Sequence, residues 1–217
     1  ATIAMRGAAG ITVRLGAVIA VESPRNFRLI VNGPMSSREA DLGSNDERFW
    51  FWNKRNEEKC VFTAKHEQET GRARQFPIPF QPDWIMESLG VIEIEADQAT
   101  VQPDLAGPQS IALMSDRISP QGLKVRKITI IDTCRGVIRE HALYDARGAL
   151  IARAALSGHF RDMNSDAVLP KQIELEWPQA HLGLTMTLSD IEVNRHIPAQ
   201  TWVMPDIEGY AVYDLSQ

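Results

Sequence analysis

The sequence predicts a mainly β fold in which one continuous antiparallel sheet is either open or closed into a barrel. Apolar and polar residues alternate along many segments, which is the pattern of a strand with one buried face. These segments follow one another about every ten residues with tight turns between them, which favours antiparallel pairing over βαβ units. Only one short helix is predicted in 217 residues, too little to cover a wide sheet. We expect a single domain over 1–217.

The composition excludes several classes of protein. Of the 217 residues, 44% are apolar and 24% are charged, with a formal net charge of −5. These ordinary fractions exclude an intrinsically disordered chain and a collagen. The longest stretch without a charge, 177–189, is too short for a membrane-spanning helix, which needs about 20 apolar residues. No cluster of Lys and Arg marks a nucleic-acid-binding face, so we expect no nucleic-acid partner.

Two strands are predicted near the N-terminus. Residues 11–22 alternate over their whole length, which predicts a long strand with one buried face and a bend at Gly16. Residues 26–32 repeat the pattern, with Phe27 and Leu29 on the same face, and a Gly-Pro pair then ends the segment.

An aromatic hairpin is predicted next. The cluster Asp41–Asp46 predicts a turn, and 47–52 predicts a strand because it carries four consecutive aromatic side chains of high β propensity. The polar segment Asn53–Lys59 predicts the hairpin turn, and 59–65 predicts the returning strand.

A proline-rich connector over 75–82 leads to the single predicted helix, at 82–90. This segment begins with Pro, carries an acidic residue in its first turn and ends in Gly, which is the asymmetry of a short helix. Ile85 and Leu89 are four residues apart and give the helix a small apolar stripe.

The second half of the chain predicts further strands at regular spacing. Ile173 and Leu175 alternate with glutamates, and Leu184 and Met186 alternate with threonines. The predicted strands are 109–115, 123–132, 137–145, 149–159, 171–178 and 183–193.

Patterns of catalytic and metal-binding residues are missing from the sequence. It contains no nucleophile elbow, no glycine-rich phosphate loop and no His-Glu-x-x-His motif. The five histidines are dispersed, and each is expected at the surface or in a hydrogen bond. We therefore expect no enzyme activity, no cofactor and no metal site, and a hydrolase with a dispersed site is the least favoured alternative.

Three further groups of residues have ordinary interpretations. Glu93 and Glu95 are expected on a solvated strand face, and Arg139–His141 on an outward strand edge. Cys60 and Cys134 are either buried free thiols or partners in a disulfide.

The aromatic run 49–52, with Trp84, Trp177 and Trp202, is the most unusual feature that remains. These side chains either form an ordinary core or line an apolar cavity of the kind that holds a lipid. The second possibility follows from the shortage of helix, because a curved sheet without a covering layer leaves apolar surface for a ligand. Both interpretations stay open from the residues alone.

Three segments, in their order and spacing, carry a resemblance to a known family. They are Val21-Glu-Ser-Pro-Arg-Asn-Phe-Arg-Leu29, Gly43-Ser-Asn-Asp-Glu-Arg-Phe-Trp-Phe-Trp-Asn53, and Leu188-Ser-Asp-Ile-Glu-Val-Asn194 followed by Ile197-Pro198, Trp202 and Pro205. Together they resemble the LolA/LolB family of bacterial lipoprotein carriers and the related LppX-like lipid-binding proteins. The resemblance extends from about Ala1 to Asp214.

The resemblance implies an incomplete antiparallel barrel whose concave apolar face is covered by short lid helices and binds an acyl chain of a lipid or lipoprotein without catalysis. It also implies a monomer that contacts membranes transiently, located in the periplasm or at the outer membrane, with or without a lipid anchor. Within 49–52, either Trp50 with Trp52 or Phe49 with Phe51 can face inward. The residues expected to bind lipid are Phe27, Leu29, Trp50, Trp52, Trp84, Ile85, Leu89, Ile173, Leu175, Leu184 and Met186.

Two departures from the family pattern are visible. Carriers of the family have a basic residue just before the proline that latches the lid, and Ser23 stands at this position. The N-terminal helix of the family is absent, so we expect the chain to derive from a longer exported precursor. The alternative function is an envelope sensor or protein-interaction module of the same fold, with a self-filled cavity and partner contacts at Asn53–Lys59 and Asp162–Pro170.

Overall fold

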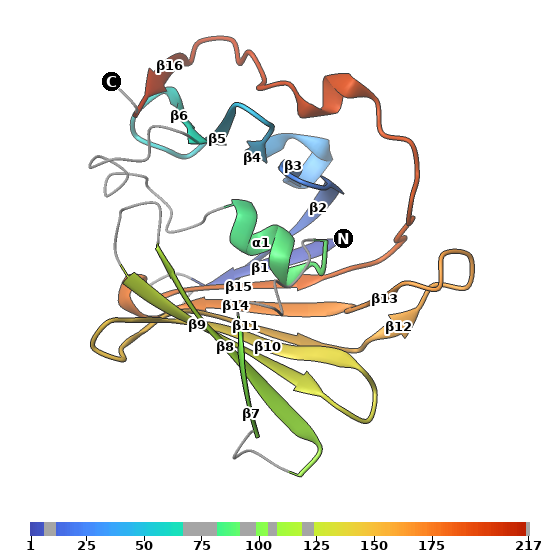
Figure 1. The fold of residues 1–217 in the computed structure, drawn as a ribbon. Helices are drawn as coiled ribbons and strands as arrows, with labels where there is room; N and C mark the ends of the chain where they lie inside the picture. Colours follow the sequence, from blue (N-terminus) through green and yellow to red (C-terminus); the bar gives the residue numbers. More distant parts are fainter. Residues whose placement is uncertain (7–11, 67–81, 92–98, 104–107, 119–123, 216–217) are drawn as a thin grey trace.

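In the computed structural model, one large sheet curves around a short helix, α1 (Pro82–Ser88), which lies inside the curve (Figure 1). The structure describes residues 1–6, 12–66, 82–91, 99–103, 108–118 and 124–215. The helical elements within these ranges are α1 and the 3-10 turns η1 (Pro34–Ser36), η5 (Pro178–Ala180) and η6 (Ala199–Trp202). None of the helices in this part of the chain has the length and apolar character needed to cross a membrane.

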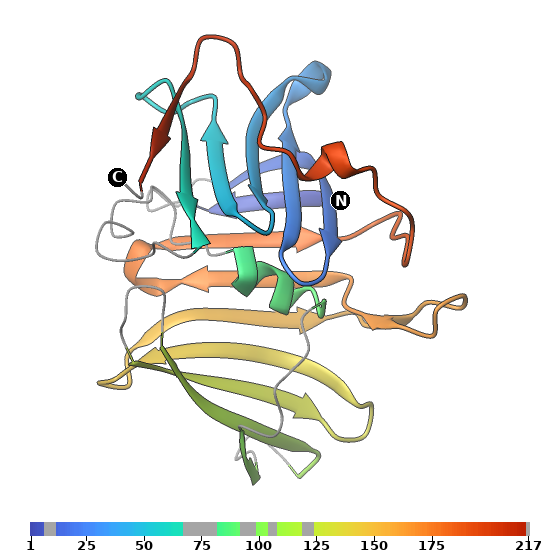
Figure 2. The same cartoon turned by 45° about the horizontal axis from the view of Figure 1, so that its top comes forward.

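Fourteen strands form the sheet. In their order across it they are β16 (Ala211–Asp214), β6 (Cys60–Lys65), β5 (Arg48–Asn53), β4 (Arg38–Ser44), β3 (Asn26–Asn32), β2 (Thr12–Glu22), β1 (Thr2–Arg6), β15 (Leu182–Thr187), β14 (Gln172–Trp177), β11 (Leu150–Ser157), β10 (Val137–Asp145), β9 (Lys124–Asp132), β8 (Ser110–Ile118) and β7 (Thr100–Pro103). A two-stranded hairpin of β12 (Phe160–Arg161) and β13 (Val168–Leu169) extends from its side (Figure 2).

The sheet is open, and all its junctions but one are antiparallel. Among the described residues, β16 and β7 form the two edges and are not paired with each other. β16 runs parallel to β6, and the chain reaches this edge by crossing over from β15 in the middle of the sheet (Figure 1). This architecture confirms the predicted fold class, a curved, mainly antiparallel sheet that forms an incomplete barrel.

Most of the predicted elements are present. The helix predicted at 82–90 is α1, and the predicted strands correspond to β2, β3, β5, β6, β8, β9, β10, β11, β14 and β15. β1, β4, β7, β12, β13 and β16 have no counterpart among the predicted strands.

The predicted turn at Asp41–Asp46 is wrong over its first four residues, which belong to β4. Asp41 is fully buried and is paired with Arg28 of β3. Gly43 lies directly opposite Trp50 of β5, where a Cβ would come within 2.1 Å of the indole ring. Residues that usually mark turns are therefore accommodated in a strand, because side chains of neighbouring strands supply their partners and fill the space beside them.

The strand predicted at 183–193 ends early, at Thr187. The N–H of the next residue, Leu188, donates to the carbonyl of Lys171 at 2.8 Å. Asp190 then adopts a left-handed backbone conformation with φ of 53°, which turns the chain away from the sheet.

Apolar side chains form rows across the inner face of the sheet, the face toward α1. The register places Phe51 between Phe62 and Leu42, and Leu29 between Leu42 and Ile19. With the side chains of α1, these residues belong to one apolar cluster, so the core lies inside the curve.

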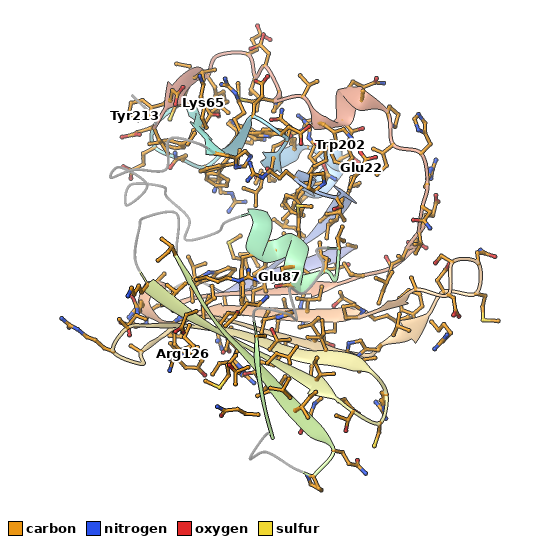
Figure 3. The ribbon with its side chains drawn as sticks, viewed as in Figure 1. Glu22, Lys65, Glu87, Arg126, Trp202 and Tyr213 are labelled. Atoms are coloured by element: carbon orange, nitrogen blue, oxygen red, sulfur yellow. The ribbon has the colours of Figure 1, made fainter. Side chains whose placement is uncertain are left out.

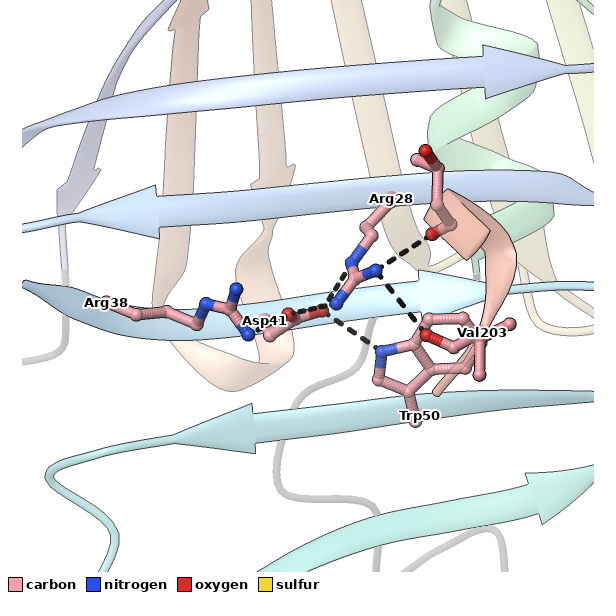
Figure 4. A network of polar contacts seen from close by, with 6 residues as sticks. Arg28, Arg38, Asp41, Trp50 and Val203 are labelled. Atoms are coloured by element: carbon pink, nitrogen blue, oxygen red, sulfur yellow. Dashed lines mark hydrogen bonds and ion pairs between the residues drawn. The ribbon is translucent and has the colours of Figure 1, made fainter. Parts of the chain in front are cut away.

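The outer face of β3, β4 and β5 carries a buried polar network (Figure 4). Arg28 donates to both carboxylate oxygens of Asp41, at 2.9 and 3.3 Å, and Trp50 Nε1 donates to Asp41 Oδ1 at 3.1 Å. Arg28 Nη1 also donates to the backbone carbonyls of Thr201 and Val203, at 2.9 and 3.4 Å. The network thereby attaches the C-terminal segment to the sheet.

Candidate functional site: the inner face of the sheet and helix α1

Helix α1 is buried on almost every side. Ile85 and Met86 are fully buried, and Trp84 and Leu89 are 6% and 5% exposed. Such a helix cannot be stable alone, because seven residues are far fewer than an isolated helix needs. Contact with the concave face of the sheet stabilises it, and the helix in turn shields that face from water.

Nine of the eleven residues predicted to bind lipid lie together in the cluster around α1. They come from β3, β14, β15, α1 and the residue that follows α1, and each is at most 6% exposed. The register places Ile173 opposite Met186 and Leu175 opposite Leu184. The nine residues are Phe27, Leu29, Trp84, Ile85, Leu89, Ile173, Leu175, Leu184 and Met186. Their role in lipid binding stays a prediction.

Trp50 and Trp52 do not join this group. They form a second apolar cluster with Val61, against which Met204, Ile207 and Tyr210 of the C-terminal segment pack. The ring of Trp52 meets that of Tyr210 edge-on, at 5.4 Å between centroids. Because side chains alternate along a strand, Phe51 lies on the inner face and belongs to the cluster around α1.

One end of α1 is tied to the sheet by charge. Glu87, on the side of α1 that faces the sheet (Figure 3), accepts a hydrogen bond at Oε1 from Lys127 Nζ of β9. Arg117 of β8 lies 3.6 Å away, measured from Nη1 to the same oxygen. Lys127 is 2% exposed, and burial lowers the pKa of its ammonium to about 8.

A buried histidine lies beside this ionic group. His141 of β10 is fully buried, and its Nδ1 is 3.0 Å from Thr129 Oγ1 of β9. Burial, reinforced by the charges of Lys127 and Arg117, lowers the pKa of His141 to about 3. The imidazole is therefore neutral at physiological pH.

Two ring nitrogens in this region have no hydrogen-bond partner among the described residues. They are Nε2 of His141 and Nε1 of Trp84, and both atoms are buried. The two rings meet edge-on, with 6.1 Å between centroids and an interplanar angle of 70°. An indole N–H can only donate, so Trp84 presents a buried donor that no described residue accepts from.

The prediction of an outward edge at Arg139–His141 is wrong for His141. The register between β10 and β9 shifts between Ile138 and Glu140, so Arg139 is the extra residue of a bulge. After the bulge, His141 lies opposite Ala154 of β11, a residue of the inner cluster. Glu140 points the other way and accepts a hydrogen bond from Arg153 at 2.6 Å.

Sequence reasoning missed this polar group for an identifiable reason. On β9, Lys127 and Thr129 face inward, whereas Ile128 and Ile130 are only half-buried. The alternation of apolar residues therefore predicts the wrong inner face for this strand. The partner of Lys127, Glu87, is 40 residues away in the sequence, and no local pattern connects the two.

The structure also decides between the alternatives for the cysteines. Cys60 and Cys134 are both free, Cys60 buried and Cys134 exposed, so they do not form a disulfide. Glu93 and Glu95 lie outside the described residues. Within the ranges that are described, no three His, Cys, Asp or Glu side chains are grouped closely enough to hold a metal ion.

A separate cavity of about 370 Å³ lies on the outer face of β8, β9 and β10. The ion pair of Arg126 with Asp116, at 3.0 Å, forms part of its wall, and the remaining wall is largely apolar. Its lining residues alternate with those of the inner face, so the sheet separates this outer cavity from α1.

Comparison with known proteins gives the fold. No protein-family model and no curated protein matches the sequence. Three solved structures are similar over nearly the whole chain: a domain from Vibrio parahaemolyticus whose proposed role is outer-membrane lipoprotein sorting, a LolA superfamily protein from Nitrosomonas europaea and a DUF1329 family protein from Desulfovibrio piger.

The identities are low and the coverage is high. In the same order, the sequence identities are 11%, 12% and 9%, and the TM-scores are 0.59, 0.56 and 0.58. The similarity covers 93%, 94% and 93% of this chain and 86%, 88% and 87% of the other chains. Together with the open curved sheet and the helix inside it, these matches show that the chain has a LolA-like fold.

Proposed function

We propose that the protein binds an acyl chain, carried by a lipid or a lipoprotein, on the inner face of the sheet beneath helix α1, without catalysis. One observation carries the proposal. Within the described residues, a single α-helix of seven residues packs against the apolar part of the inner face, which extends over β1–β6, β11, β14 and β15. An amphiphile that displaces this helix finds a wide apolar surface already formed.

The energetics of exchange favour a long apolar ligand. Moving α1 aside uncovers Trp84, Ile85, Met86 and Leu89 together with the surface beneath them. A ligand must therefore cover that surface again, and each buried methylene contributes about 0.8 kcal/mol. A chain of many methylenes can offset the loss, whereas a small polar ligand cannot.

The fold supports a location in the bacterial envelope. Lipoprotein sorting at the outer membrane is the proposed role of the similar domain from Vibrio parahaemolyticus. If this protein uses the fold for a similar task, it is located in the periplasm or at the outer membrane, and we propose this location. In that compartment, the inner face of the sheet would shelter the acyl chain from water while the chain moves between membranes.

The test uses two neighbouring alanines of β11. Ala154 is fully buried on the inner face, and Ala155 points to the outer face. Purified protein is extracted for bound lipid by mass spectrometry and is then titrated with a fluorescent fatty acid. Ala154→Leu fills space beneath α1, so we expect the affinity for the probe to fall by about tenfold or more, whereas Ala155→Leu should leave it within about twofold.

Equal affinities for the two variants, with both folded by circular dichroism, would contradict the proposal. The absence of both co-purified lipid and probe binding would favour the alternative, a sensor or protein-interaction module. The dense packing of the inner face favours that alternative, since Ile85, Met86, Ile173 and Met186 leave almost no surface exposed. A partner would then contact loops such as Asp162–Pro170, where Met163 is 91% exposed.

A further inference from the structure

Among the described residues, the ionic group beneath α1 carries an excess of positive charge. Lys127 and Arg117 share one carboxylate, that of Glu87, and both lie within reach of its Oε1. The other carboxylates that the structure describes on β8 and β10 near this group are engaged elsewhere. Asp116 pairs with Arg126 on the outer face, and Asp145 accepts hydrogen bonds from the backbone of its own hairpin turn.

The two unpartnered nitrogens belong to the same neighbourhood. Thr129 lies directly opposite His141 and two residues along β9 from Lys127, so these three side chains share the inner face. Trp84 and Glu87 are three residues apart on α1 and lie on the same side of the helix. Once α1 with Trp84 and Glu87 has moved aside, an oxygen-rich group placed here would meet the two cations, Lys127 and Arg117, beside the buried imidazole of His141.

From this arrangement we infer that the ionic group is the head-group site for the bound acyl chain, and that it selects chains ending in an anionic oxygen group over neutral ones. The inference rests on the proposed function, because it needs an acyl chain beneath α1. A carboxylate and a phosphate share the required chemistry, since both accept hydrogen bonds from ammonium and guanidinium groups.

Glu87 acts as an internal competitor in this scheme. In the structure its carboxylate accepts a hydrogen bond from Lys127, and Arg117 lies close to the same carboxylate oxygen. When α1 moves aside, Glu87 leaves with it and the anionic group of the ligand takes its place on the two cations. His141, held neutral at physiological pH, adds no third positive charge to the site. Entry of the anion and release of the helix are therefore coupled.

The first experiment needs no variant. Oleic acid, oleyl phosphate and methyl oleate, which share one chain and differ in charge, compete with the fluorescent probe for the wild-type protein. We expect the better of the two anionic ligands to bind about tenfold or more tightly than methyl oleate. The order of oleic acid and oleyl phosphate identifies which anion the site prefers.

Variants then locate the selectivity. Arg117→Met removes a partly exposed cation and should lower the ratio between the affinity for the better anion and the affinity for methyl oleate. Lys127→Met should have the larger effect, and its folding is checked by circular dichroism. Glu87→Gln removes the competitor and should raise the affinity for the anion. Arg126→Met, on the outer cavity, is the control and should change nothing.

The outcomes separate the two proposals. Binding of none of the three ligands would overturn the proposed function, and the head-group site with it. Equal affinity for all three would overturn the head-group site and leave acyl binding intact. Loss of the preference in Arg126→Met but not in Arg117→Met would place the anion at the outer cavity and likewise overturn the inference.

Discussion

Glu87 of α1 and Lys127 of β9 form a buried ion pair that ties the helix to the β8–β10 half of the sheet. Both side chains are at most 7% exposed, so each charge depends on the other for compensation. We expect Lys127→Met to lower the free energy of unfolding by about 3–5 kcal/mol, because it leaves the Glu87 carboxylate buried, with Arg117 as its remaining partner among the described residues. Urea unfolding measures the loss.

A double variant provides the decisive comparison. Replacing both charges, with Glu87→Leu and Lys127→Met together, removes the uncompensated group and should recover most of the stability. An exposed pair serves as the reference, since Glu140→Gln removes the partner of Arg153, whose side chain is 41% exposed. That change should cost about 1 kcal/mol or less. A double variant as unstable as the worse single variant would show that the ion pair is not what holds the helix.

Gly43 and Trp50 set the packing of β4 against β5. A Cβ at Gly43 would lie 2.1 Å from the Trp50 ring, so Gly43→Ala must displace the indole and disturb its hydrogen bond to Asp41. We expect a loss of about 1–3 kcal/mol in the free energy of unfolding. Gly16→Ala in β2 is the matched control, because a Cβ there meets nothing within 4 Å. It should leave stability unchanged or raise it by about 0.5–1 kcal/mol.

The hydrophobic pattern predicts most of this sheet because each long strand buries one face. The pattern fails where a residue distant in the sequence supplies the countercharge or the packing that makes a segment form a strand. β4 contains Asp41 and Gly43, which predict a turn, and the strand forms because Arg28 compensates the charge and Trp50 fills the space. No window of sequence around 41–44 contains that information.

In the candidate site, too, some residues could be placed from the local pattern and others could not. Nine of the eleven predicted lipid-binding residues gather on the inner face, since strands with clean alternation fix which side is buried. Trp50 and Trp52 are the exceptions, because the C-terminal segment gives the outer face of β5 an apolar cover of its own. Lys127 and His141 escape prediction because their partners come from other strands and from α1.

His141 makes stability depend on pH. Its pKa is about 3 in the folded protein and 6.5 in an unfolded chain, so below pH 6.5 the unfolded state takes up a proton that the folded state does not. Unfolding therefore becomes easier as the pH falls from 6.5 towards 3, by at most about 1.4 kcal/mol per pH unit. Above pH 6.5 both states are neutral and the contribution is complete.

Urea unfolding between pH 6.5 and 4.5 tests this dependence, in a range where most carboxylates stay ionised. His141→Gln should flatten the slope. His159→Gln should flatten it less, because burial lowers the pKa of His159 but a hydrogen bond with the backbone of Ile138 opposes the shift. An unchanged slope in His141→Gln would mean that the imidazole is protonated in the folded state.

Asp41 is expected to hold the C-terminal segment in place, because it orients the Arg28 side chain that binds this segment. Asp41→Asn weakens the hold on Arg28, whose Nη1 donates to the carbonyls of Thr201 and Val203. Amide hydrogen exchange in 199–204 should therefore accelerate by about tenfold or more, in line with a loss of at least about 1.4 kcal/mol. Arg38→Ala removes a side chain that is 43% exposed and should have little effect. Equal exchange in the two variants would exclude the network as the attachment.

The two thiols should differ sharply in reactivity. Cys134 is exposed and should react rapidly with a disulfide reagent, whereas Cys60 is 7% exposed and burial raises the pKa of its thiol. Native protein should show one fast thiol and urea-unfolded protein two, and Cys134→Ser should remove the fast phase. Two fast thiols in the native protein, or none, would contradict the structure.

The slow thiol also reports on the sheet edge. Cys60 lies opposite Ala211 of β16, the strand that joins the edge by a parallel pairing of only four residues. Detachment of β16 uncovers Cys60 before the rest of the sheet opens, so its labelling rate should rise in Asp41→Asn, in which the preceding C-terminal segment is loosened. If the rate instead follows only global unfolding, β16 holds its place independently of the contacts at Thr201 and Val203.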